Sequence, residues 1–318
     1  MKLIINIPAY NESEAIGKTI KNLPRDFDGI DEVLVQVVDD GSKDGTADIS
    51  REAGADIVIS HSTNRRLGEV FNTAVESALE NGADIMVNID ADGQFDSGEI
   101  VSLLKPIFDG KADMTVGDRF KAGSADGIPV IKNTLNKLGA KIVGKFLNTE
   151  IDDLTCGFRA HNRETLLKLN KVSGFTYTQE TIIDAIGKNL KITWVPVTVK
   201  YFEGRQSRVV KSVWKFVNNS AKIIIKAMRD VRPMKFFGIP GVIIMTAAFI
   251  TFTIFLILYI PELHVTPYRN YLFTSIALLL VGMQFLIFAL IADMIKSNRQ
   301  LTEDMMYQIK KQKYEQKK

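Results

Sequence analysis

VNIDADGQFD, residues 87–96, is an apolar run that ends in three oxygen-bearing side chains at alternate positions. On an extended segment Asp90, Asp92 and Gln94 could point in one direction, because side chains two residues apart lie on the same face of a strand. Asp and Gly clusters after an apolar run often form only a turn. Other features of the sequence are needed to distinguish a turn from a binding site.

Strand-like segments alternate with helical segments from residue 1 to about residue 205. The strand-like segments are KLIINIPAY, EVLVQVVDDGS, ADIVIS, ADIMVNIDAD and ADMTVGDRF, and helices are expected at 12–23, from Asp44 onward and at 67–80. This alternation predicts an α/β, Rossmann-like domain with a mostly parallel sheet covered by helices. In such sheets ligands bind beyond the carboxyl ends of the strands.

Polar clusters follow four of the five strands: PAYNE, VVDDGS, IDADGQ and GDRF. Four such ends on one edge of a sheet favour a binding site over separate turns. Familiar nucleotide signatures do not account for them. No G-x-G-x-x-G follows the first strand, and GAKIVGKF (139–146) looks helical and has Phe146 where a P-loop needs Ser or Thr. His61, His161 and His264 are too scattered to predict a zinc site or a catalytic triad.

The oxygen ligands at 90, 92 and 94 suit a hard divalent cation, Mg²⁺ or Mn²⁺, bound jointly with substrate phosphates. Such an ion stabilises the charge of a departing diphosphate without a proton donor. We therefore expect Asp90, Asp92 and Gln94 to form a metal site.

A mean hydropathy of +0.04 is high for a soluble enzyme, so the apolar residues must be concentrated in one part of the chain. That part lies near the C-terminus. Residues 236–260 carry no charge, and residues 271–292 have only Gln284 as a strongly polar side chain. Each run is long enough to span about 30 Å of hydrocarbon. We expect a transmembrane hairpin over residues 234–293. The net charge of +3 does not indicate a nucleic-acid partner, and Cys156, the single cysteine, is expected to be a small buried side chain.

Basic residues flank both spans, whereas the loop between the spans has only Arg269. The positive-inside rule then places both termini and the N-terminal domain in the cytoplasm, as in a multi-pass protein of the cell membrane. Residues 294–318 would form a basic cytoplasmic tail, in which Met294, Leu301, Met305 and Ile309 suggest a possible homo-oligomer.

An apolar stripe at helical spacing runs through residues 209–233. It predicts an amphipathic helix in the bilayer interface, with packing on its own domain as the alternative. The stripe consists of Val210, Val213, Trp214, Val217, Ala221, Ile224, Ile225 and Met228.

Five motifs, PAYNE, VVDDGSKDGTADI, IDADGQF, VGDRF and DLTCGFRA, resemble in this order the GT-A glycosyltransferases of family 2. They are most similar to the polyprenyl-phosphate glycosyltransferases related to dolichyl-phosphate mannose synthase. The resemblance covers about residues 1–210 and implies a GT-A catalytic domain over residues 1–208. It also implies inverting transfer of a sugar from a UDP- or GDP-linked donor to a polyprenyl phosphate, such as dolichyl or undecaprenyl phosphate.

The resemblance implies a role for each matching residue. Pro8, Tyr10 and Glu12 would line the nucleotide pocket, and Val38 and Asp40 would contact the base or the ribose. Asp90 and Ala91 would touch the nucleotide sugar, while Asp92 and Gln94 would hold the metal. Asp92, Arg119 and Arg208 are the expected catalytic residues, with Arg119 and Arg205 also at the nucleotide sugar.

One segment departs from the family pattern. Relatives carry an Arg, then a Gly, then Ser-Lys close to the membrane, whereas YFEGRQSRVVK has Phe202 in the place of the first Arg. Ser207 and Arg208 match the Ser-Lys pair, and Arg205 is the candidate substitute for the missing Arg. Arg119, Arg205 and Arg208 are the expected contacts for the acceptor phosphate.

A lipid monophosphate needs no catalytic base, because its second pKa of about 6 leaves it largely a dianion at neutral pH. The alternative is transfer to a hydroxyl of a glycan or a membrane lipid, which needs a base, and Asp153 and Glu180 are unassigned acids that could serve. A processive polysaccharide synthase typically has more spans and a Gln-x-x-Arg-Trp motif, and this sequence has neither.

Overall fold

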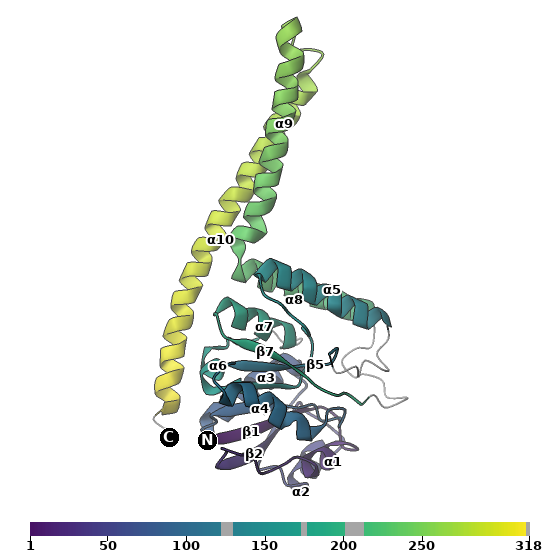
Figure 1. Cartoon of the computed structure of the whole chain (residues 1–318), viewed down its shortest axis with the longest axis vertical. Coiled ribbons are helices and arrows are strands. Elements are labelled where there is room, and N and C mark those ends of the chain that lie inside the picture. The colour runs from purple at the N-terminus through teal and green to yellow at the C-terminus, as the bar shows by residue number, and fades with distance from the viewer. Residues whose placement is uncertain (122–129, 173–176, 201–212, 316–318) are drawn as a thin grey trace. The chain divides into compact units, whose positions relative to one another are not determined.

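The computed structural model describes residues 1–121, 130–172, 177–200 and 213–315 (Figure 1). The chain separates into two compact units, Met1–Ile224 with Glu303–Lys318, and Ile225–Thr302.

A seven-stranded sheet forms the centre of the first unit, with the strand order β3-β2-β1-β4-β6-β5-β7. The strands are β1 (Lys2–Ala9), β2 (Glu32–Asp39), β3 (Ile57–Ser60), β4 (Ile85–Asn88), β5 (Met114–Asp118), β6 (Arg159–Asn162) and β7 (Ile192–Pro196). Only β6 runs antiparallel to its neighbours β4 and β5. The expected mostly parallel sheet and its five expected strands are confirmed, whereas β6 and β7 were not predicted.

Helices cover both faces of this sheet (Figure 1). Met86 of β4 and Met114 of β5 are both register partners of His161 in β6, so these three side chains lie on one face of the sheet. On that face the ring centroids of His161 and of Phe71 in α3 are 5.8 Å apart. Thr115 points to the other face and donates to the Leu103 carbonyl of α4 at 2.9 Å. The helices of this part are α1 (Ile16–Lys21), α2 (Thr46–Glu52), α3 (Arg66–Glu80), the 3₁₀ turn η1 (Ser97–Glu99), α4 (Ile100–Phe108), α5 (Val130–Leu147), α6 (Arg163–Lys168) and α7 (Thr178–Gly187).

A buried amide network ties the three central parallel strands together. Gln36 of β2 donates to Asn6 of β1 at 2.9 Å, and Asn6 donates to Asn88 of β4 at 2.7 Å. A slip in strand register would leave these buried groups unpaired, at a cost of about 1–3 kcal/mol for each group. The network therefore keeps the carboxyl ends of β1, β2 and β4 level at one edge.

The C-terminal end of the long helix α10 (Arg269–Glu315) packs within the first unit. The Tyr307 hydroxyl donates to Glu164 at 3.0 Å, and the Lys310 ammonium donates to the Leu169 carbonyl at 3.0 Å. Tyr314 is only 4% exposed and belongs to the core formed with α3 and α6. Residues 303–315, part of the segment 294–318 that we expected to be a basic cytoplasmic tail, thus belong to this unit.

The second unit is a helical hairpin preceded by the end of α8 (Val213–Val231) and a π-helical turn, η2 (Met234–Gly238). Helix α9 (Ile239–Glu262) and helix α10 each contain an 18-residue window with mean hydropathy 2.5, of which 17% is buried. Both helices are long and apolar enough to cross a membrane, and their apolar surface is mostly exposed rather than packed in a core.

Two glycines let the helices of the hairpin approach each other closely. A Cβ added at Gly282 of α10 would lie 3.1 Å from the backbone nitrogen of Met245 in α9, and one added at Gly241 would lie 3.0 Å from Leu286. Small residues of this kind are typical of interfaces between membrane helices, where packing has no help from the hydrophobic effect.

Candidate active site

The loop after β4 has a fixed backbone. The backbone N–H of Gln94 donates to the Asp92 carboxylate at 3.1 Å, and Gly93 adopts a φ of 69°, which favours glycine. The Thr19 hydroxyl of α1 donates to the Ala91 carbonyl at 2.9 Å. The loop is therefore a turn, as its composition indicates, but a turn held in place by a neighbouring helix.

The carboxylate of Asp90 lies against the backbone of Gly157. A Cβ added at Gly157 would lie 3.0 Å from Asp90 Oδ1, so only glycine fits without a shift. The Tyr177 hydroxyl donates to the Gly157 carbonyl at 3.1 Å and so helps to hold Gly157 in this position. The motif DLTCGFRA thus shapes the position of the Asp90 side chain.

The electrostatics of this loop fit a divalent cation. Burial, and then the neighbouring Asp92 carboxylate, raise the pKa of Asp90 to about 7. A cation between two such acids would relieve their repulsion. In the described ranges there is no group of three or more His, Cys, Asp or Glu side chains that could hold a metal. A cation at Asp90 and Asp92 would therefore need Gln94 and ligand oxygens to complete its coordination.

Arg119, just after β5, binds Asp153 in a two-pronged ion pair. Its Nε lies 2.7 Å from Oδ2, its Nη2 lies 3.0 Å from Oδ1, and Nη2 also donates to Thr155 at 2.7 Å. Burial alone would raise the pKa of Asp153, but the Arg119 guanidinium outweighs it and holds that pKa below its usual range. Asp153 is therefore an ionised carboxylate paired with Arg119.

Arg159 of β6 is a fully buried cation next to this site, and our sequence reasoning assigned it no role. Its Nε donates to the Cys156 carbonyl at 2.6 Å and its Nη1 to the Thr178 carbonyl at 2.7 Å, while the guanidinium lies over the Tyr177 ring at 5.6 Å. Its charge acts on Asp90 and favours the ionised carboxylate. The sequence signal was its place in the motif DLTCGFRA, between Phe158 and Ala160.

Asp40 and Val38, expected at the base or the ribose, both lie in the interior. Val38 is fully buried in the core against α3. The Asp40 carboxylate lies 2.8 Å from His61 Nδ1 and accepts the backbone N–H groups of Arg65 and Arg66, each at 2.8 Å. Asp40 therefore fixes the start of α3, and His61 is a partner that the sequence did not suggest.

The loop after β1 is fastened to the loop after β2. The backbone N–H of Asn11 donates to Ser42 at 2.8 Å, and that of Glu12 donates to Thr46 at 2.9 Å. Tyr10 is 41% exposed, and Pro8 is partly exposed at the end of β1. The structure thus brings Pro8, Tyr10 and Glu12 to the same edge as the loop after β4.

The chain before residue 201 returns to this loop. The Lys200 N–H donates to the Gln94 carbonyl at 2.8 Å, and Val199 forms an isolated antiparallel bridge with Phe95. Arg205 and Arg208, together with Phe202 and Ser207, lie outside the described residues. The described part of the chain therefore reaches the loop after β4 at Lys200.

Two other side chains are inert interior groups. Cys156 is buried, as expected, and burial raises the pKa of its thiol to about 12. His161 is fully buried, and burial, followed by the Arg159 charge, lowers its pKa to about 3. The segment 139–146 is helical within α5, which confirms that it is not a phosphate-binding loop.

Comparisons with known proteins agree with this geometry. Residues 4–169 match the model of glycosyl transferase family 2. The chain is 30% identical over 224 residues to UDP-N-acetylglucosamine–dolichyl-phosphate N-acetylglucosaminyltransferase of Methanococcus voltae, covering 64% of this chain and 87% of that protein. It is also 30% identical over 211 residues to polyprenol monophosphomannose synthase of Mycolicibacterium smegmatis, covering 62% of this chain and 77% of that protein.

Among solved structures, glucosyl-3-phosphoglycerate synthase of Mycobacterium tuberculosis is similar in fold. Its complex with UDP has a TM-score of 0.58 at 20% identity and covers 71% of this chain and 80% of that chain. Its complex with Mn²⁺, UDP and phosphoglyceric acid has a TM-score of 0.56 at 19% identity, covering 71% and 78%. At this identity the likeness establishes the GT-A fold alone.

Proposed function

This chain belongs to glycosyl transferase family 2, and we propose that it transfers a sugar from a nucleotide-diphosphate sugar to a membrane polyprenyl phosphate, with inversion at the anomeric carbon. The observation that carries the proposal is the pair Asp90 and Asp92, fixed at the carboxyl edge of the sheet by Gly157 and Thr19. The names of two relatives, which refer to dolichyl phosphate and to polyprenol, support the acceptor class.

Asp90, Asp92 and Gln94 are the proposed ligands of Mg²⁺ or Mn²⁺, together with the donor diphosphate. The bound ion would offset the negative charge that develops on the departing nucleotide diphosphate. Pro8, Tyr10 and Glu12 would line the nucleotide, which is UDP or GDP, with Asp40 behind them. Asp90, next to Ala91, would also position the sugar.

The acceptor phosphate would act as the nucleophile without a protein base, because it is largely a dianion at neutral pH. The protein would then act by positioning the two substrates and by stabilising the charge that develops in the transition state. Arg119, Arg205 and Arg208 are the proposed phosphate contacts. Since Arg119 is already bound to Asp153, we expect Arg205 and Arg208 to supply more of the acceptor contact.

The rival function, transfer to a hydroxyl, needs an acid that can accept a proton. Asp153 suits that role poorly, because its lowered pKa makes it a weak base and both of its oxygens accept hydrogen bonds from Arg119. Glu180, in the first turn of α7, is the remaining candidate. Loss of all activity in Glu180→Gln, in a protein that still folds, would favour the hydroxyl acceptor.

We also propose that the chain resides in the cell membrane with both termini and the catalytic unit in the cytoplasm, and that α8 lies in the bilayer interface. Reporters placed after Lys318 and near His264 should locate to opposite sides of the membrane, with Lys318 cytoplasmic. Both reporters on one side would mean that a span does not cross.

The test of the reaction is incubation of the purified full-length protein in detergent with polyprenyl phosphate and a panel of labelled nucleotide sugars. One labelled sugar should enter a lipid product with wild-type protein and fail to do so with Asp92→Ala. Label in a water-soluble glycan, or no transfer from any donor, would contradict the proposal.

A further inference from the structure

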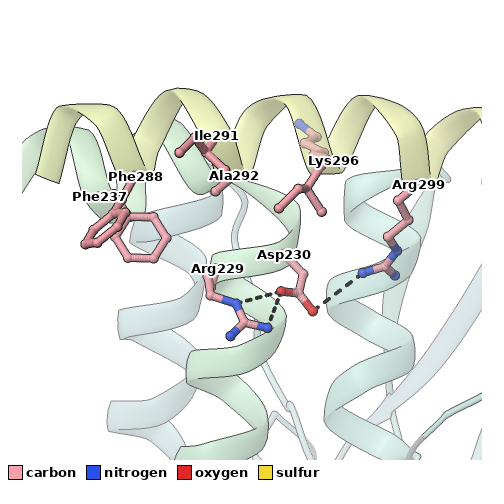
Figure 2. A pocket seen from close by; sticks show the side chains of 9 residues that line it. Arg229, Asp230, Phe237, Phe288, Ile291, Ala292, Lys296 and Arg299 are labelled. Atoms are coloured by element: carbon pink, nitrogen blue, oxygen red, sulfur yellow. Dashed lines mark hydrogen bonds and ion pairs between the residues drawn. The ribbon is translucent and has the colours of Figure 1, made fainter. Parts of the chain in front are cut away.

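A pocket of about 600 Å³ lies within the second unit, between the end of α8, η2 and α10 (Figure 2). It is separate from the loops of the candidate active site, all of which belong to the first unit. Its lining combines charged and apolar side chains: Arg229, Asp230, Phe237, Phe288, Ile291, Ala292, Ile295, Lys296 and Arg299.

The charged part of the pocket is a carboxylate between two arginines. Arg229 Nη2 lies 2.7 Å from Asp230 Oδ1, and Arg299 Nη1 lies 3.5 Å from Asp230 Oδ2 (Figure 2). The side chains of Arg229 and Arg299 remain 47% and 42% exposed, so solvent and ligands can reach both guanidinium groups. Two arginines and one aspartate leave this group with a net charge of +1, and Lys296 adds a further positive charge to the lining.

The apolar part of the pocket consists of residues near the ends of the two candidate spans. Phe237 and Phe288 pack edge to face with centroids 6.3 Å apart, and Ile291 follows Phe288 by about one turn on α10 (Figure 2). Arg229 and Arg299 lie outside the apolar runs 236–260 and 271–292, on their basic flanks. A ligand that contacts both parts of the pocket must have a charged group at one end and an apolar chain at the other.

We propose that this pocket binds one anionic glycerophospholipid, with the phosphodiester at Arg229 and Arg299 and an acyl chain against Phe237 and Phe288. Basic pockets between membrane helices on the cytoplasmic side are a known means of binding anionic head groups. A phosphodiester carries one negative charge and matches the group formed by the two arginines and Asp230. A phosphomonoester dianion would place a second negative charge beside Asp230, with Lys296 as the further positive charge in the lining. The proposal rests on the membrane placement proposed above.

The test uses the full-length protein in detergent micelles and native mass spectrometry. The probes are phosphatidylglycerol, phosphatidylcholine with matched acyl chains, polyprenyl phosphate and inorganic phosphate. The variant is Arg229→Gln with Arg299→Gln, and the matched control is Arg269→Gln, which removes an exposed arginine of α10 outside the pocket. A second variant, Arg229→Lys with Arg299→Lys, keeps the charge in case the first pair of changes impairs folding.

We expect one phosphatidylglycerol to bind wild-type protein about tenfold more tightly than phosphatidylcholine. Both lipids present the phosphodiester, but the trimethylammonium group of phosphatidylcholine brings a positive charge next to Arg229, Arg299 and Lys296. The preference should vanish in the double Gln variant and persist in Arg269→Gln and in the double Lys variant. Equal binding of the two phospholipids, or an unchanged preference in the double Gln variant, would overturn the proposal. So would tighter binding of polyprenyl phosphate through the same arginines, or release of the lipid by inorganic phosphate alone. Sugar transfer by the same proteins is assayed separately, so failure of this proposal is distinguishable from failure of the proposed reaction.

Discussion

Arg119 and Asp153 form a buried ion pair in which two guanidinium nitrogens contact the two carboxylate oxygens at 2.7 and 3.0 Å. Asp153 is fully buried and Arg119 is 16% exposed, so the pair lies under the surface of the site. The pair joins the end of β5 to the segment that contains Gly157. A substitution of Arg119 would therefore change the shape of the site as well as any direct contact of Arg119 with a substrate.

A double-variant comparison separates these two roles. Arg119→Gln should lower the free energy of unfolding by about 3–5 kcal/mol, because it leaves the buried Asp153 carboxylate unpaired. Adding Asp153→Asn should restore at least half of that loss, since an amide pair carries no buried charge. If Arg119 also contacts a substrate phosphate, kcat/KM should stay about tenfold or more below wild type in the double variant. Recovery of kcat/KM together with stability would show a structural role only.

The metal site can be tested with a control from the same loop. Asp92→Ala should reduce turnover by about a hundredfold or more, since the metal is expected to supply several kcal/mol of charge stabilisation. Asp96→Ala should keep near-wild-type turnover, because Asp96 is exposed and caps only the short turn η1. EDTA should abolish wild-type turnover, and Mg²⁺ or Mn²⁺ should restore it. Full activity of Asp92→Ala in EDTA would rule out the metal role.

The contact between Gly157 and Asp90 predicts a strong effect of a single methyl group. Gly157→Ala should lower kcat by about tenfold or more, because its Cβ would lie 3.0 Å from Asp90 Oδ1 and would displace the carboxylate. Gly139→Ala is the matched control, because a Cβ at Gly139 meets no atom within 4 Å. That change in a helix interior should stabilise the protein by about 0.5–1 kcal/mol and leave kcat unchanged. Equal kcat in the two variants would contradict the assigned position of Asp90.

His161 predicts a specific dependence of stability on pH. Its pKa is about 3 in the folded protein, well below the 6.5 of an unperturbed histidine. Below pH 6.5 the unfolded chain binds a proton that the folded chain does not, so the stability present above pH 6.5 is lost at about 1.4 kcal/mol per pH unit. Asp90 acts in the opposite direction between pH 7 and 5, because its raised pKa of about 7 lets the folded chain hold a proton that the unfolded chain releases. The contribution of His161 is therefore measured as a difference between proteins, from unfolding followed by tryptophan fluorescence over this range. The slope should be lower by about 1.4 kcal/mol per pH unit in His161→Leu than in the wild type and unchanged in His264→Gln; equal slopes in all three proteins would contradict the assignment.

Much of the first unit could be predicted because its strands are apolar and end in polar clusters. β1, β2, β4 and β5 follow that pattern, and parallel strands necessarily bring their carboxyl ends to one edge. β6 does not, because its four residues include the buried polar side chains of Arg159 and His161. Their placement depends on partners far along the chain, such as Thr178 and Phe71.

The contacts of Asp40 and of the C-terminal helix are likewise tertiary. Asp40 has a polar partner 21 residues away in His61, which no local pattern reveals. Leu301 and Met305, which suggested self-association of the C-terminal segment, are 65% and 67% exposed in the single chain, and self-association stays a prediction. Tyr307 and Tyr314, at helical spacing, make the actual contacts with the first unit.

The most direct test of the account compares two acceptors that differ only in the phosphate. Purified protein is given equal concentrations of polyprenyl phosphate and the corresponding polyprenol, with one ¹³C-labelled nucleotide sugar that supports turnover. Mass spectrometry identifies the product, and the one-bond coupling at the anomeric carbon gives its configuration. We expect sugar on the phosphorylated lipid alone, with the configuration of the donor inverted. Transfer to polyprenol at a comparable rate, or a product with retained configuration, would contradict it.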